Sequence, residues 1–207
     1  MAVITDISVQ KRNSDRVSIF LDGEFAFGLL ASVAEELRLG QELSESEIKR
    51  LQRQEQFEQA KQNAFGLVSG RPRSEFELRT HLSRKHFEAD VIEDVVLRLR
   101  ELALLDDMAF AEYWVEQRES FRPRSHMALR QELYQKGISR EIIDQVLETV
   151  DEVAAAGRAA EKRAHQWAGL PKETFSEKMA GYLGRRGFSY EIINEITEKA
   201  WQAVNEA

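Results

Sequence analysis

The residues best able to do chemistry in this chain are lysines and arginines that gather in three segments. Residues 71–86 and 118–136 each hold five Lys or Arg against two acids, and residues 158–186 hold seven against three. Guanidinium and ammonium groups bind phosphates and carboxylates through charge-assisted hydrogen bonds. The segments therefore predict anion-binding surfaces, although the chain as a whole has a net charge of -7. The simpler alternative is that they are solvated helix faces with local ion pairs.

The remaining polar residues show no arrangement typical of a catalyst. The chain has no cysteine, which excludes thiolate catalysis, disulfides and cysteine-based zinc sites. Its four histidines lack the spacing of metal-ligand motifs: His81, His86, His126 and His165. No Walker or G-x-S-x-G motif occurs, and Gly184 to Gly187 is a predicted helix end. We therefore expect a protein that is not an enzyme and that needs no metal or other cofactor.

The basic segments are placed by a sequence unit that occurs three times. The apolar series around Ile92 recurs around Ile143 and Ile193, at spacings of 51 and 50 residues. The same offsets connect a second apolar set: Leu78, Leu129 and Met179. A fixed period of this length is typical of repeat architectures, and the apolar spacing within each unit is helical. The sequence predicts a mainly α fold with three tandem three-helix repeats in an elongated, curved array.

A small sheet is predicted before the repeats. Between residues 3 and 28 apolar and polar residues alternate and are interrupted by Asn, Asp and Gly, which favours a hairpin or a meander of two or three strands. A helix is expected over Leu29–Leu37, and a polar helix begins at Ser44, which forms a capping box with Glu47. The expected organisation is an N-terminal β segment with a helix over residues 1–56, then repeats over 57–105, 106–150 and 151–207.

Turn residues recur in register with the repeats. Gly137 and Gly187 are predicted to end the middle helix of repeats two and three in the left-handed conformation. His86 stands at the equivalent position of repeat one, so a more strained turn is expected there. Asp106-Asp107 supplies N-cap residues for the first helix of repeat two.

Charges are expected to separate within each repeat. Acids concentrate in the third helices: Glu88, Asp90, Glu93, Asp94, Glu141, Asp144, Glu148, Glu191, Glu195 and Glu198. Stacked units would then carry their basic first and second helices on one edge and these acids on the other. A continuous basic ridge focuses the electric field and can meet phosphate. The tryptophans lie within apolar stripes and are predicted core anchors rather than base-stacking platforms: Trp114, Trp167 and Trp201.

A denser signature runs through repeat two. It consists of Leu104-Leu105-Asp106-Asp107, then Phe110-Ala111, Trp114 and Arg118, and it continues as Leu129-x-x-Glu132-Leu133-x-x-Lys136-Gly137-Ile138 with Ile142 to Leu147. This series resembles the central signature of the RecX family of bacterial recombination regulators. The resemblance covers roughly residues 57–200, and Ala103 departs from it by standing where a glycine often precedes Leu-Leu-Asp-Asp.

The resemblance implies a binding protein for RecA nucleoprotein filaments. Such a protein lies along the helical groove of the filament, across neighbouring protomers, and suppresses ATP hydrolysis, strand exchange and coprotease activity in recombination, DNA repair and the SOS response. A monomeric, cytoplasmic protein is expected. We expect no signal peptide and no membrane segment, because the most apolar stretch, residues 25–34, is shorter than the roughly 18 residues that a span requires.

The candidate binding residues are the basic residues of the matched motif and their repeat equivalents. They are Arg118, Arg122, Arg124, Arg130, Lys136, Arg71, Arg73, Arg79, Arg84, Lys85, Arg158, Lys162, Arg163, Arg185 and Arg186. We expect them to meet an acidic RecA surface or the DNA of the filament. One alternative is a direct DNA-binding module, because three-helix units are similar to helix-turn-helix folds. That module would hold single- or double-stranded DNA with a steep salt dependence. Another is a helical scaffold that touches neither RecA nor DNA.

Overall fold

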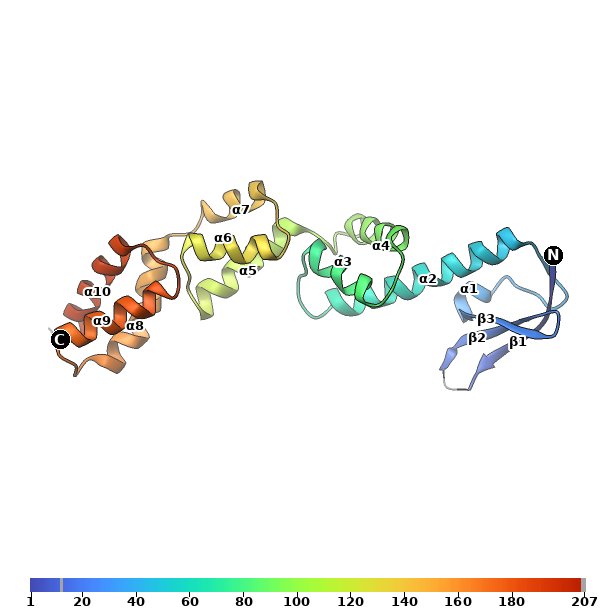
Figure 1. The fold of residues 1–207 in the computed structure, drawn as a ribbon, viewed down its shortest axis with the longest axis horizontal. Coiled ribbons are helices and arrows are strands. Elements are labelled where there is room, and N and C mark those ends of the chain that lie inside the picture. The colour runs from blue at the N-terminus through green and yellow to red at the C-terminus, as the bar shows by residue number, and fades with distance from the viewer. Residues whose placement is uncertain (12, 206–207) are drawn as a thin grey trace. The chain divides into compact units, whose positions relative to one another are not determined.

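The computed structural model describes residues 1–11 and 13–205. Its N-terminal part is an antiparallel sheet with the strand order β3-β2-β1-β4. The strands are β1 (Ala2–Gln10), β2 (Asn13–Leu21) and β3 (Glu24–Leu30), which Figure 1 labels, and β4 (Glu42–Leu43). The predicted meander corresponds to β1, β2 and β3. The two-residue β4 was not expected, and it pairs with the start of β1 through Ala2 and Leu43.

The helix expected over Leu29–Leu37 is wrong in extent. Leu29 and Leu30 remain in β3, where they pair with Val17 and Arg16 of β2. Only α1 (Ala31–Ala34) follows the strand. The apolar run is explained by burial, because Leu29 and Leu30 are part of the core between the sheet and the helices. A run of buried leucines fits a strand as well as a helix, so periodicity alone could not distinguish them.

Helix α2 (Glu45–Val68) connects the sheet to the first repeat. It begins with the predicted capping box, in which Ser44 Oγ accepts from the Glu47 amide and Glu47 Oε2 accepts from the Ser44 amide. Its first half contributes Leu51 to the core of the sheet. The buried Glu55 accepts a hydrogen bond from the Leu30 amide and forms a 2.6 Å ion pair with Arg16 of β2. A polar helix is thereby fixed to the sheet at one end, and its length contacts α4.

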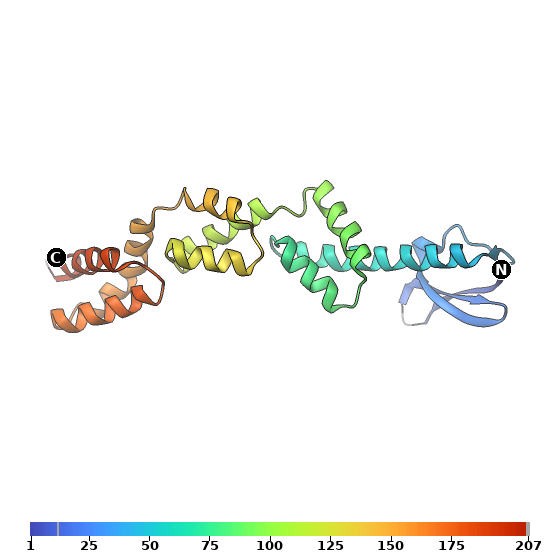
Figure 2. The ribbon, with the colours of Figure 1, turned by 45° about the horizontal axis from the view of Figure 1, so that its top comes forward.

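The three predicted three-helix repeats are confirmed (Figures 1 and 2). The first is completed by α3 (Glu75–Arg84) and α4 (Ala89–Glu101); the second contains α5 (Asp107–Phe121), α6 (His126–Gln135) and α7 (Arg140–Leu147); the third contains α8 (Glu152–Trp167), α9 (Lys172–Gly184) and α10 (Tyr190–Asn205). Equivalent residues of the middle helices are fully buried in every copy: Leu78, Leu129 and Met179, and Leu82, Leu133 and Leu183. None of the described helices is both long and apolar enough to cross a membrane.

The chain forms two compact units. The first unit contains residues 1–71 and 78–104, and the second contains residues 72–77 and the chain from Leu105 onward. All three tryptophans lie in the second unit and pack as core anchors, as predicted. The Trp114 ring lies 5.9 Å from that of Phe110, and the rings of Trp167 and Trp201 lie 6.5 and 5.2 Å from that of Phe175.

The turns that end the middle helices have the predicted backbone conformation. Gly137 and Gly187 have φ angles of 77° and 87°. His86, the equivalent residue of repeat one, has a φ of 64°, and Ala103 has a φ of 53°. Residues with a Cβ rarely adopt this left-handed conformation, so the strain expected at His86 is present.

Glycine is required at the other two turns because another helix lies against them. A Cβ built on Gly137 would lie 2.4 Å from the Cβ of Phe76, at the start of α3. One built on Gly187 would lie 2.5 Å from the Oγ of Ser125, at the start of α6. In both cases the end of one middle helix contacts the first turn of the preceding one. His86 has no preceding three-helix repeat, and its side chain is exposed.

Hydrogen bonds between the first residues of helices also connect successive repeats, and we call this contact region the repeat junction. Asp107, the first residue of α5, accepts from the Glu75 amide at 2.8 Å, and Glu152, the first residue of α8, accepts from the His126 amide at 3.2 Å. Glu75 and His126 are the first residues of α3 and α6, whose opening amides have no partner within the helix. The neighbouring Asp106 caps α5 itself, accepting from Met108 and Ala109. The predicted acidic cap therefore serves two helices.

Candidate functional site

Four of the predicted binding residues line one hollow in the second unit. Arg122 and Arg124 follow the end of α5, Arg185 and Arg186 follow the end of α9, and together they enclose about 220 Å³, which we call the arginine hollow. The repeat junction brings these distant segments together, because the Ser125 amide donates to the Arg186 carbonyl at 3.1 Å.

Arg124 of the hollow forms an ion pair with Glu132, a carboxylate that also has other partners. Glu132 of α6 lies 3.0 Å from Arg124 Nε, 2.7 Å from Arg118 Nε and 2.8 Å from Trp114 Nε1. The Arg118 guanidinium also lies over the Trp114 ring, with 4.6 Å to its centroid. Both oxygens of Glu132 are engaged, so this carboxylate holds α5 against α6 and orients Arg124.

Arg186 is held in place by stacking rather than by an acid. Its guanidinium lies over the Tyr182 ring at 3.8 Å from the centroid, and its Nε is buried without a hydrogen-bond partner. Burial lowers the pKa of the Arg186 guanidinium from its ordinary value; Tyr182 acts in the opposite direction, and the charges of Arg124, Arg122 and Arg163 lower it again. An arginine remains protonated at neutral pH despite such a shift.

The hollow therefore concentrates uncompensated positive charge. Within residues 1–11 and 13–205, Arg122, Arg185 and Arg186 form no ion pair with a carboxylate. Like charges gathered without a counter-ion destabilise the fold unless an anion binds. The geometry is suited to an anion that several guanidinium groups can share.

Most other candidates are already paired. Arg79 lies 2.8 Å from Glu93, Lys136 lies 2.6 Å from Glu77, and Arg73 lies 3.9 Å from Glu77. Arg158 pairs with Glu119, and Arg130 pairs with Asp144. Lys136 also lies 5.0 Å from the Trp114 ring centroid, and Arg163 donates to Gln166 and lies 5.4 Å from the Tyr182 centroid. For these paired residues the structure favours local ion pairs.

The predicted separation of bases and acids onto opposite edges is wrong. The Arg79–Glu93 and Arg130–Asp144 pairs join the middle and third helices of repeats one and two at equivalent positions. Arg130 holds the pKa of Asp144 below its usual range. In repeat three both partners are replaced together, because Ala180 and Asn194 occupy the equivalent positions. The acids of the third helices therefore neutralise part of the basic face.

The remaining candidates are not gathered into a cluster. Arg84, Lys85 and Lys162 are exposed. Lys85 lines a separate hollow of the first unit with His81 and residues near the end of α2. Arg71 is half-buried after the end of α2. Among the described residues no group of three or more His, Asp or Glu is placed to hold a metal ion.

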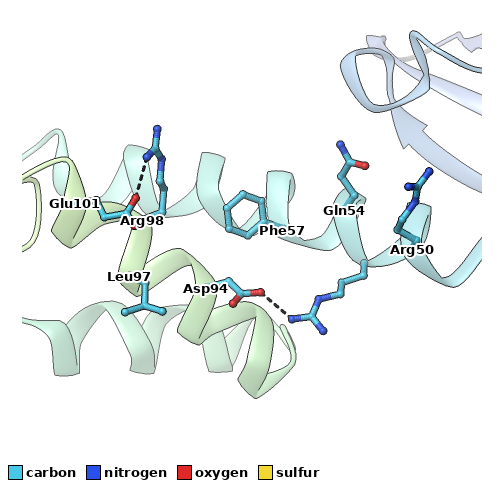
Figure 3. A pocket seen from close by; sticks show the side chains of 8 residues that line it. Arg50, Gln54, Phe57, Asp94, Leu97, Arg98 and Glu101 are labelled. Atoms are coloured by element: carbon cyan, nitrogen blue, oxygen red, sulfur yellow. Dashed lines mark hydrogen bonds and ion pairs between the residues drawn. The ribbon is translucent and has the colours of Figure 1, made fainter. Parts of the chain in front are cut away.

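A hollow of the first unit between α2 and α4 has a different character (Figure 3). It measures about 520 Å³, and its lining includes Phe57 of α2 and Leu97 of α4. Arg53 forms 2.8 Å ion pairs with Asp90 and Asp94, and Arg98 pairs with Glu101. Since its charges are largely compensated, this hollow offers no concentration of charge comparable with the arginine hollow. Its lining residues lie on two helices that are far apart in the chain, so the sequence alone does not predict this hollow.

The fold defines a helical-repeat protein in which three-helix domains follow a small N-terminal sheet. Comparison with protein families gives the same division. Models described as the RecX N-terminal domain and the first, second and third RecX three-helix domains match residues 2–44, 60–99, 106–147 and 150–197. This chain belongs to the RecX family of regulatory proteins.

Individual relatives agree with this membership. A "Regulatory protein RecX" of Clostridioides difficile is 30% identical, covering 96% of each chain. Another of Bacillus licheniformis is 33% identical over 96% of this chain and 78% of its own length. A crystal structure of a regulatory protein RecX is 27% identical, with a TM-score of 0.69 over 96% of this chain and all of that one.

Proposed function

We propose that this chain regulates RecA by binding RecA nucleoprotein filaments and reducing their ATP hydrolysis, strand exchange and coprotease activity. RecX family membership supports this role. The observation that carries the binding mode is the arginine hollow, where three guanidinium groups that have no acidic partner among the described residues lie together. A nucleoprotein filament presents phosphates and acidic side chains, which are the groups that such a surface recognises.

The chain acts in this proposal as a binding partner with no reaction of its own. A regulator needs only to bind one state of the filament more tightly than another, because a ligand shifts an equilibrium by its difference in affinity between the two states. Two of the four arginines are held in place, Arg124 by Glu132 and Arg186 by Tyr182 and the hydrogen bond from Ser125. Preorganised groups lose less conformational freedom on binding.

The second candidate is a direct DNA-binding module, which the exposed arginines also favour. The two differ in what they bind best. With labelled single-stranded DNA, a RecA regulator should bind the RecA-coated strand more tightly than the bare strand, by about tenfold or more in dissociation constant. Equal or tighter binding to the bare strand, with a steep fall in affinity as salt rises, would contradict the regulator and support the DNA-binding module.

A further inference from the structure

We propose that the arginine hollow binds phosphate groups of a nucleic-acid strand and recognises them without reading the bases. This assignment rests on the proposed function and names the ligand of the same site. The hollow is lined by Arg122, Arg124, Arg185 and Arg186 alone. Its described lining therefore offers guanidinium donors for oxyanions and no aromatic or amide side chain that could distinguish one base from another.

The number of free guanidinium groups favours phosphate over a carboxylate. A carboxylate has only two oxygens, and those of Glu132 already bind Arg118, Arg124 and Trp114. Arg122, Arg185 and Arg186 form no ion pair with an acid in the part of the chain that the structure describes. A phosphate group presents its oxygens in three dimensions, and successive phosphates along a strand supply further charge. Arginine forks match this geometry.

The fold also holds Arg186 of the hollow in a fixed position. Arg186 is stacked on Tyr182, and its carbonyl accepts from Ser125, so the backbone and side chain of this residue are both fixed. Its Nε–H is shielded from solvent and has no hydrogen-bond partner within residues 1–11 and 13–205. Buried donors are normally satisfied, and the fold keeps this one beside three further positive groups.

A strand is favoured over a free nucleotide by what surrounds the hollow. The described lining of the hollow has no aromatic side chain on which a base could stack, whereas Phe121, the residue before Arg122, is 77% exposed. Aromatic side chains beside basic residues stack on bases of any sequence, as in single-strand-binding proteins. Phe121 is thus a sequence-tolerant contact for a strand whose phosphates occupy the arginines.

The test measures binding of the full chain to a short labelled oligothymidine as salt is varied, without RecA. Arg185→Gln with Arg186→Gln should weaken binding about tenfold or more and reduce the salt slope by about 1.4, since each single-strand phosphate contact contributes about 0.7. The control, Arg140→Gln with Lys178→Gln, removes the same charge from exposed residues of the second unit outside the hollow and should leave the slope unchanged. Equal losses in both pairs would overturn the site.

Three further measurements on the same protein identify the ligand. A mixed-sequence strand of equal length should bind like oligothymidine, and a strong base preference would contradict the assignment. Polyglutamate should bind more weakly, and equal binding that the hollow variant also abolishes would assign the site to carboxylates instead. Protection against heat by inorganic phosphate, without binding of either strand, would assign it to a free phosphate.

Thermal stability gives a second readout, both without and with the oligonucleotide. If the hollow stores repulsion, the Arg185→Gln, Arg186→Gln variant should unfold at the same or a higher temperature than the parent in buffer without multivalent anions. The oligonucleotide should raise the melting temperature of the parent and not that of the variant. A variant that melts well below the parent would show that these arginines hold the fold together and would contradict the proposal. RecA inhibition that persists in a variant unable to bind the strand leaves the proposed function standing.

Discussion

The contact between Gly137 and Phe76 makes the packing of the repeats directly testable. In the variant Gly137→Ala, an alanine must adopt a φ of 77°, which costs about 1–2 kcal/mol. Its Cβ would also lie 2.4 Å from the Cβ of Phe76. No rotation of the Phe76 side chain moves that atom, so the backbone must shift, and overpacking of this kind costs about 1–3 kcal/mol. The expected loss in free energy of unfolding is therefore about 2–5 kcal/mol.

Tryptophan fluorescence during urea unfolding measures this loss selectively, because all three tryptophans lie in the second unit. For a chain of this size the loss corresponds to a melting temperature lowered by about 4–20 °C. The matched control is Gly157→Ala within α8, where nothing lies within 4 Å of the added Cβ. That variant should be more stable by about 0.5–1 kcal/mol, since alanine favours a helix interior. A Gly137→Ala variant within about 0.5 kcal/mol of the parent would refute the reasoning.

Other predictions concern single contacts. Glu132→Gln should destabilise the second unit by about 1–3 kcal/mol in the same assay, because Arg118 and Arg124 lose their acid; Glu112→Gln, at an exposed residue of α5, should change it by less than about 0.5 kcal/mol. His86→Gly should stabilise the first unit by about 1 kcal/mol by removing a Cβ at positive φ, measured by amide hydrogen exchange in α3 and α4. The Ser44 amide and, after it, the Ser44 hydroxyl donate to Glu47 and lower its pKa, and Ser44→Ala removes the hydroxyl. This carboxylate stabilises the fold above its unfolded-state pKa, and that contribution is lost as pH falls through its folded pKa. In carboxyl NMR titrations Ser44→Ala should raise the pKa of Glu47, and an unchanged pKa would contradict the capping box.

The cores of the repeats could be predicted because the same apolar residues recur at a fixed spacing along the chain. Leu78, Leu129 and Met179 are all fully buried, as their register indicated. The left-handed turns at Gly137 and Gly187 could also be predicted from the sequence, because few residues other than glycine adopt this conformation. His86 has the same conformation, so its position in the repeat determines the turn there even though the residue is not glycine. Local signals such as the Ser44 capping box lie within four residues and need no tertiary information.

The contacts between repeats could not be predicted in the same way. Asp107 looked like a cap of its own helix, yet it accepts from Glu75, 32 residues earlier. Arg122 and Arg186 are 64 residues apart, and only the folded junction shows that they share a hollow while Arg79 and Arg130 pair with acids. Charge counts along the chain identify basic segments, but ion pairs across helices decide which charges remain free.

ATP turnover by RecA on single-stranded DNA, measured while the purified chain is added, tests the central claim most directly. Turnover should fall as the chain is added, and the Arg140→Gln, Lys178→Gln variant should inhibit like the parent. Unchanged turnover at excess chain, with RecA filaments present and the chain folded, would contradict the claim that this RecX family member regulates RecA.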